Sequence, residues 1–221
     1  MKLRDRLGLT KRHQRIAAQA MQYGLFGMIA VGFYEGSVGV MVNAGVGFVI
    51  TYVPALLERD YDIELDPALV LWITLAVFLH GFGTVGLPGA EAHPYRSIWW
   101  WDHMTHMFSA SLVAGAGYVT VRAIDEHTDA VSFPPRFTFV FILLFTMSFG
   151  VFWEVIEFAI ALAAEATGAP RVLTQYGLED TMKDLLFDTL GGIVVAVWGT
   201  AYLTGLTETL TERLGASGGM E

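Results

Sequence analysis

The sequence predicts an all-α, polytopic integral membrane protein, a bundle of about six transmembrane helices with both termini in the cytoplasm. Composition is the first observation behind this fold class. Of the 221 residues, 54% are hydrophobic and 16% are charged, with a mean hydropathy of +0.50, whereas soluble domains are about 45 to 50% apolar. The other two observations are a series of long apolar runs and an uneven distribution of Lys and Arg between them.

Six apolar runs reach the roughly 20 residues that a helix needs to cross the hydrocarbon layer. They cover residues 16–35, 38–57, 67–87, 99–122, 137–165 and 179–206. Stretches rich in Gly, Pro or acidic residues separate them, as turns between helices require. We therefore expect one six-helix membrane domain over residues 16–210, between a basic cytoplasmic segment at 1–15 and a short polar tail at 211–221.

The basic residues predict the orientation of these helices. With the N-terminus inside, ten Lys and Arg fall on the cytoplasmic side, whereas only Arg96 and Arg171 fall outside. Loops rich in Lys and Arg stay in the cytoplasm, so we expect a multi-pass protein of the cell membrane with both termini inside. The net charge of −9 argues against nucleic acid as a partner, and the expected partners are membrane lipids.

The last apolar run begins with acidic residues. Asp180, Asp184 and Asp188 recur every four residues, so they share one side of a helix, drifting by roughly 40° per step. A charged side chain at membrane depth costs at least about 2.5 kcal/mol, so such residues turn toward partners or a wet cavity. This side of the helix is therefore expected to face the interior of the bundle.

Other runs carry polar residues at a similar depth. At 1.5 Å per residue, all of them fall within roughly 16 Å of the outer ends of their helices. Asp102 and His106 are four residues apart, and Glu154 and Glu157 three apart, so each pair shares a helix face. The set outside the last run consists of His80, Asp102, His103, His106, Glu154 and Glu157. These positions predict one polar site in the outer half of the bilayer.

Charge balance suggests a metal at this site. Six carboxylates face one intramembrane cation, Lys183, so protons or bound cations must neutralise the excess. With no cysteine in the chain, a His and carboxylate set suits zinc, iron or manganese, whereas carboxylates alone suit magnesium or calcium. The candidate ligands are His80, Asp102, His103, His106, Glu154, Asp180 and Asp184. The alternative to a metal site is a purely structural network. In that network His80 is a hydrogen-bonded packing residue and Lys183 pairs with Asp180.

Three blocks of the sequence resemble the YjdF-like family of small polytopic membrane proteins, which is loosely similar to VanZ-like proteins. The blocks are WDHMTHMFSA, FWEVIEF and EDTMKDLLFDTLGG, within about residues 95–200. The motif positions that the resemblance implies are Asp102, His106, Glu154, Glu157, Asp180, Thr181 and Asp184. His103 and Asp188 depart from the pattern. The family has no settled activity, so the resemblance implies a fold and a site but not a reaction.

The function that these residues favour is metal-dependent chemistry, such as hydrolysis, on a lipid or lipid-linked substrate. Glu157 and Asp188 are the candidate catalytic residues, with Glu157 as general base on a metal-bound water. The HExxH, GxSG and GxGD patterns of other membrane enzymes are absent. A cation- or proton-coupled transporter and a non-catalytic protein that binds an extracellular ligand are the alternatives. No inverted repeat favours transport.

Overall fold

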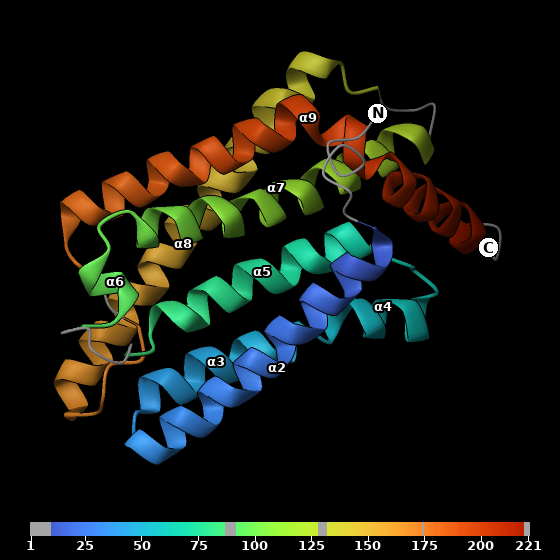
Figure 1. Ribbon diagram of the computed structural model, residues 1–221. Helices are drawn as coiled ribbons and strands as arrows, with labels where there is room; N and C mark the ends of the chain where they lie inside the picture. The colour runs from blue at the N-terminus through green and yellow to red at the C-terminus, as the bar shows by residue number, and fades with distance from the viewer. Residues whose placement is uncertain (1–9, 87–91, 128–131, 174, 219–221) are drawn as a thin grey trace. The chain divides into compact units, whose positions relative to one another are not determined.

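The computed structural model (Figure 1) describes residues 10–86, 92–127, 132–173 and 175–218, and every regular element in these ranges is a helix. The chain forms two compact units. Unit 1 comprises Met1–Thr105 and Ala159–Thr174, and unit 2 comprises His106–Phe158 and Gln175–Glu221. The predicted all-α class is confirmed. The helices are those of a polytopic membrane bundle.

Unit 1 contains the first five helices of the described residues, and each begins where the local sequence favours a helix start. They are α2 (Lys11–Glu35), α3 (Val38–Ile50), α4 (Val53–Tyr61), α5 (Pro67–Gly83) and α6 (Pro94–Ser97). The side chains of Thr10, Ser37 and Asp66 accept hydrogen bonds from the first turns of α2, α3 and α5, as N-cap residues do. Gly36, with φ of 67°, ends α2 in the left-handed conformation that favours glycine.

Close packing of α2, α3 and α5 forms the core of unit 1, and Figure 1 shows these three helices side by side. Leu25, Met28 and Ala44 are buried at the centre. A Cβ at Gly81 would lie 3.0 Å from the Leu25 side chain and 3.5 Å from the Ala44 Cα. The absence of a side chain at Gly81 therefore lets the three helices approach one another, as in other membrane bundles.

Unit 2 is built from three long helices. The first residues of one and the last residues of another belong to unit 1. The three helices are α7 (Trp101–His127), α8 (Pro135–Thr167) and α9 (Leu178–Gly218). Glycines again mark the close contacts. A Cβ at Gly191 of α9 would lie 3.0 Å from the backbone nitrogen of Ser111 in α7, and one at Gly192 would lie 3.3 Å from Thr146 Oγ1 in α8. These contacts place α9 against both of the other helices.

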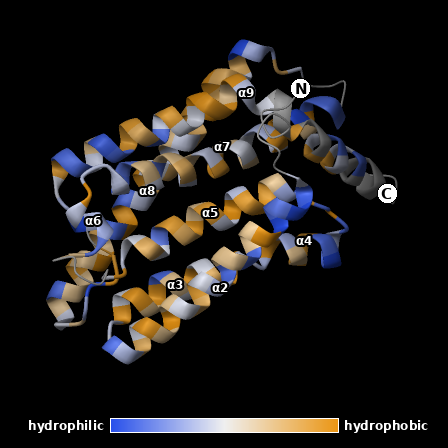
Figure 2. Ribbon diagram, viewed as in Figure 1, coloured by the Kyte–Doolittle hydropathy of each residue, from blue (hydrophilic) through white to orange (hydrophobic). Residues whose placement is uncertain are grey.

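Helix α9 has its polar and apolar faces arranged as a membrane requires. Asp184 and Asp188 are buried, whereas Leu186, Leu190 and Val194 are exposed by 63%, 46% and 45%. A helix in water would turn these faces the other way. The hydropathy colours of Figure 2 show apolar residues along most of the helices, which is expected where lipid covers the outer surface.

The predicted runs correspond to helices with two differences. The second run, at 38–57, is interrupted at Thr51-Tyr52 and forms α3 and α4, because Pro54 lies in the first turn of α4 and favours a helix start. In the described part of the chain, four helical stretches are long and apolar enough to cross a membrane: Lys11–Glu35, Val38–Tyr61, Trp101–His127 and Pro135–Thr167. Helix α5, with 17 residues, is shorter, and α9, which contains the sixth run, is not one of the four. Of the basic segment at 1–15, residues 1–9 lie outside the described part.

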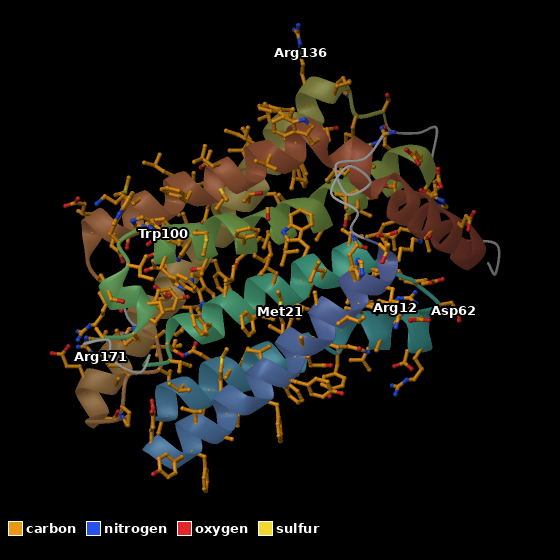
Figure 3. The ribbon with its side chains drawn as sticks, in the orientation of Figure 1. Arg12, Met21, Asp62, Trp100, Arg136 and Arg171 are labelled. Carbon is orange, nitrogen blue, oxygen red and sulfur yellow. The ribbon has the colours of Figure 1, made fainter. Side chains whose placement is uncertain are left out.

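The orientation of unit 1 in the membrane can be tested with two exposed positions near its opposite ends. Figure 3 shows Asp62 and Arg171 at opposite ends of this unit. Glu64 and Ala169 lie close to them in sequence and are exposed. In the cysteine-free chain, we expect an impermeant thiol reagent to label Ala169→Cys but not Glu64→Cys in intact cells. Labelling at position 64 alone would invert the predicted orientation.

Candidate metal centre

Among the described residues of unit 2, three carboxylates and one histidine are buried, on three different helices. Asp184 and Asp188 of α9 are 1% and 3% exposed, Glu154 of α8 is 5% exposed, and His106 of α7 is 8% exposed. Gly191 and Gly192, at the helix contacts described above, let the three helices pack closely beside these side chains. The four side chains therefore form one polar cluster, called here the His106 cluster, where the three helices pack together.

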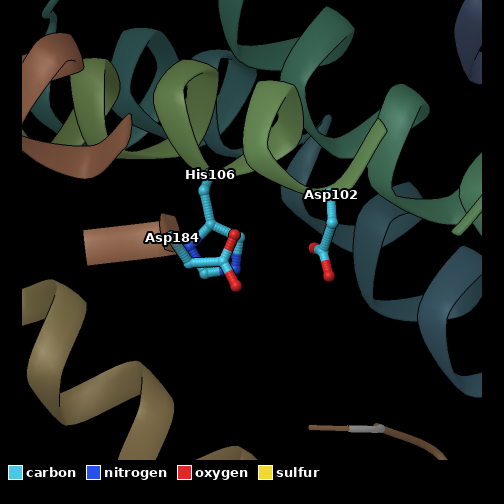
Figure 4. A group of neighbouring side chains, drawn as sticks. All are labelled: Asp102, His106 and Asp184. Carbon is cyan, nitrogen blue, oxygen red and sulfur yellow. The ribbon is translucent and has the colours of Figure 1, made fainter. Parts of the chain in front are cut away.

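The imidazole of His106 lies between two carboxylates. Its Nδ1 is 3.3 Å from Asp188 Oδ1, and its Nε2 is 3.9 Å from Glu154 Oε1. The first distance permits a hydrogen bond, whereas the second is too long for one. A ligand atom of Asp184 lies within 4.8 Å of one on His106, and Figure 4 shows the two side chains next to each other. His106 and Asp184 thus form a His and Asp group that could hold a metal ion.

The two oxygens of Glu154 have different surroundings. Oε2 accepts hydrogen bonds from Thr181 Oγ1 at 2.7 Å and from Gln175 Nε2 at 3.4 Å. Gln175 also donates to Thr181 Oγ1 at 3.0 Å, so the loop before α9 and its first turn hold this side of the carboxylate. Oε1 is buried and has no hydrogen-bond partner among the described residues. An acceptor in that position is costly unless something else occupies it.

Gly150 provides the space that Asp188 occupies. It lies one turn before Glu154 on α8, so both residues share a helix face. A Cβ at Gly150 would collide with Asp188 Oδ2. The missing side chain on α8 therefore allows the α9 carboxylate to reach the His106 ring.

Several predicted site residues are near this cluster in sequence. Asp102 and His103 lie on α7, and Asp102 shares a helix face with His106 one turn later (Figure 4). Asp180, in the first turn of α9, accepts a hydrogen bond from the Tyr176 backbone nitrogen at 3.3 Å. Glu157 accepts one from Trp153 Nε1, four residues earlier on α8, at 3.1 Å. The roles expected for these residues stay predictions.

His80 belongs to a separate hydrogen-bonded chain in unit 1. Its Nε2 is 3.0 Å from Asn43 Oδ1, and its Nδ1 is 2.7 Å from the Tyr95 hydroxyl. Asn43 Nδ2 donates to the carbonyl oxygens of Gly39 and Val172 at 2.8 and 2.7 Å. Both ring nitrogens of His80 therefore have protein partners, which favours the packing role over the role of metal ligand.

Lys183, the expected intramembrane cation, has another partner. Its Nζ lies 2.7 Å from Glu179 Oε1, one turn earlier on the exposed side of α9.

Sequence reasoning did not identify Gly150 or Gln175. The spacing of Gly150 one turn before Glu154 was an available signal, whereas no local pattern marks Gln175.

The packing role of Gly150 predicts the effect of adding a side chain. We expect Gly150→Ala to lower the free energy of unfolding by about 1 to 3 kcal/mol, because the methyl group displaces the Asp188 carboxylate. Thermal unfolding in a neutral detergent measures this loss. Gly27→Ala is the matched control, since a Cβ there has no heavy atom within 4 Å and alanine is favoured over glycine in helices by up to about 1 kcal/mol. Equal melting temperatures for the two variants would contradict the packing role.

Comparison with known proteins supports the membrane assignment. The sequence model of a family described as "Predicted membrane protein (DUF2238)" matches residues 16–205. A protein of Thermotoga maritima described as uncharacterized is 29% identical over 143 residues, which are 65% of this chain and 67% of that protein. No solved structure matches. Because the family match extends over most of the sequence, from within α2 into α9, this chain belongs to the DUF2238 family of predicted membrane proteins.

Proposed function

We propose that this protein binds a divalent metal ion at the His106 cluster and uses it for chemistry on a lipid or lipid-linked substrate. The ligands would be His106 Nε2 and Glu154 Oε1, which lie 3.9 Å apart, and Asp184, a ligand atom of which lies within 4.8 Å of one on His106. We also propose that the DUF2238 match and the YjdF-like resemblance describe one group of proteins, because the matched range contains all three motif blocks.

The observation that carries this proposal is the buried Oε1 of Glu154. It has no hydrogen-bond partner among the described residues and faces His106 Nε2 at 3.9 Å. Two ligand atoms bound at about 2.1 Å and at the tetrahedral angle lie about 3.4 Å apart. The gap in the structure is therefore close to the separation that a shared metal ion requires.

Electrostatics supports a cation at this position. The cluster contains three carboxylates and one imidazole, so full ionisation gives −3 from the acids and at most +1 from His106. The remaining charge of −2 would be buried in an apolar unit, where uncompensated charges are strongly unfavourable. A metal-bound His106 is neutral, so one divalent ion beside three ionised carboxylates would lower the buried charge from −3 to −1, and one further proton would bring it to zero.

Asp188 has a different role in this proposal from the catalytic role expected from the sequence. A hydrogen bond from His106 Nδ1–H to Asp188 Oδ1, at 3.3 Å, leaves the lone pair on Nε2, which faces Glu154. Carboxylates that hold a metal-binding histidine in this way fix its tautomer and ring orientation. Asp188 would therefore be a positioning residue, with Thr181 and Gln175 acting on Glu154 in the same way.

The donor set also limits the choice of metal and of chemistry. One imidazole with two carboxylates and no sulfur suits zinc, iron or manganese, and magnesium or calcium would use the carboxylates alone. A divalent ion at such a site supplies Lewis acidity toward a carbonyl or phosphoryl oxygen and makes water nucleophilic at neutral pH.

The apolar, exposed side of α9 would lie against lipid, which favours a membrane-borne substrate. Glu157 remains the candidate general base.

The ligand assignment predicts the metal content of single variants. We expect purified wild-type protein to retain a divalent metal, and His106→Ala, Glu154→Gln and Asp184→Asn to weaken its binding by more than about a hundredfold, because even outer-shell partners contribute about 10- to 100-fold. Elemental analysis of protein prepared without chelator gives the metal content, and a competition titration gives the affinity. Glu179→Gln is the control, since Glu179 lies on the same helix but is exposed and paired with Lys183.

A structural network without metal predicts the opposite result. Asp184→Asn would then be silent or stabilising, because it removes a buried charge and keeps the side-chain volume. Wild-type protein without metal, or ligand variants that bind metal as tightly as Glu179→Gln does, would contradict the proposal.

The positioning role of Asp188 has a separate test. We expect Asp188→Asn to bind metal about 10- to 100-fold more weakly than wild type, while the melting temperature of the metal-free protein stays the same or rises. The chelator concentration that removes half of the metal measures this change. Wild-type affinity in Asp188→Asn would show that Asp188 does not position His106, while leaving the ligand assignment standing.

A further inference from the structure

Unit 1 contains a cavity, lined in part by polar side chains, that the metal centre does not explain. Its volume is about 170 Å³, and its lining comes from α2, the α3–α4 turn and the first turns of α5. The lining residues are Arg15, Ala18, Gln19, Gln22, Thr51, Val70 and Thr74. Helices α2 and α5 begin and α3 ends at this end of unit 1 (Figure 1), so the cavity lies near helix ends, where a membrane protein meets the lipid headgroups.

The cavity is lined by a polar stripe along an apolar helix. Arg15, Gln19 and Gln22 are four and then three residues apart on α2, so they share one face. The same helix exposes large apolar side chains, such as Tyr23 and Phe26, that suit contact with lipid. Polar residues on a membrane helix normally face a partner or a wet cavity, and this stripe lines the cavity.

The charge of the lining is positive. Of the lining residues named above, Arg15 carries a charge and the others are neutral. Arg15 has no ion pair in the described part of the chain. Lys11, one turn earlier on α2, differs because its Nζ lies 3.6 Å from Asp66 Oδ2. On the same helix, therefore, Lys11 is paired with a carboxylate, whereas Arg15, at the cavity, is available to bind an anion.

Hydrogen-bonding groups complete the lining. Gln22 Nε2 donates one of its two hydrogens to Thr51 Oγ1 at 2.8 Å, which leaves the second hydrogen and the amide oxygen. The Gln19 amide is exposed and adds another donor and another acceptor. The cavity thus offers one fixed positive charge, several donors and a few acceptors, a combination that fits an anion carrying hydroxyl groups.

We propose that this cavity binds the headgroup of an anionic phospholipid, with its phosphate on the Arg15 guanidinium and its hydroxyl groups on Gln19 and Gln22. Arginine binds phosphate through paired N–H donors. Basic pockets between transmembrane helices near the headgroups are suited to such lipids. The acyl chains would extend along the apolar surface of α2. This site is separate from the metal centre and does not depend on the proposed function.

Native mass spectrometry in neutral detergent micelles doped with phosphatidylglycerol tests the proposal, because no charged bilayer surface then contributes to binding. We expect wild-type protein to retain phosphatidylglycerol in preference to phosphatidylcholine. Arg15→Gln should lower its occupancy on the order of fivefold, the contribution of one basic side chain near anionic lipid. Gln19→Leu should also lower it, and this variant leaves the net charge unchanged.

Arg12→Gln is the matched control, since Arg12 is an exposed arginine of α2 that does not line the cavity. It should retain phosphatidylglycerol within about twofold of wild type, well under the contribution of one basic side chain at the site. Equal losses in Arg12→Gln and Arg15→Gln, or no retention by wild type, would overturn the proposal. Thermal stabilisation of lipid-free protein by inorganic phosphate as large as that by phosphatidylglycerol would also overturn the lipid assignment, because the ligand would then be a free anion.

Discussion

Burial of three carboxylates around one imidazole is the constraint on which the rest of unit 2 depends. Asp184, Asp188 and Glu154 are each 5% exposed or less, and His106 is 8% exposed. Acids in an apolar environment must be protonated or paired with cations. The hydrogen bonds to Glu154 Oε2 and the contact between Asp188 and His106 satisfy part of this requirement. The unpartnered Glu154 Oε1 is the position where a cation would satisfy the rest.

The helix packing of unit 2 serves this arrangement. Gly191 lets α9 approach α7, and Gly150 leaves room for the Asp188 carboxylate on α8. Because these contacts use small residues, the polar groups meet without a long side chain bridging the helices. The opposite face of α9 carries exposed leucines such as Leu186 and Leu190. One helix thus buries two carboxylates on its inner side and exposes apolar side chains on its outer side.

The sequence predicted the helices from the length of its apolar runs, and it predicted much of the cluster from the cost of placing charge in lipid. The four-residue spacing of Asp180, Asp184 and Asp188 indicated an inward face, and the structure buries the latter two. Contacts between distant segments were not predictable from spacing. Gln175 reaches Glu154 from a loop. A local pairing also differed from the expected one, because Lys183 pairs with Glu179, four residues earlier, instead of Asp180, three residues earlier.

Anomalous X-ray diffraction at the absorption edge of the bound metal tests the central claim most directly. The metal-binding account predicts one strong peak between His106 Nε2 and Glu154 Oε1, in contact with Asp184, with the His106–Asp188 hydrogen bond intact. A strong peak at other residues would contradict the account. So would the absence of a peak together with Glu154 Oε1 at hydrogen-bond distance from His106 Nε2, which would identify the cluster as a proton-sharing network.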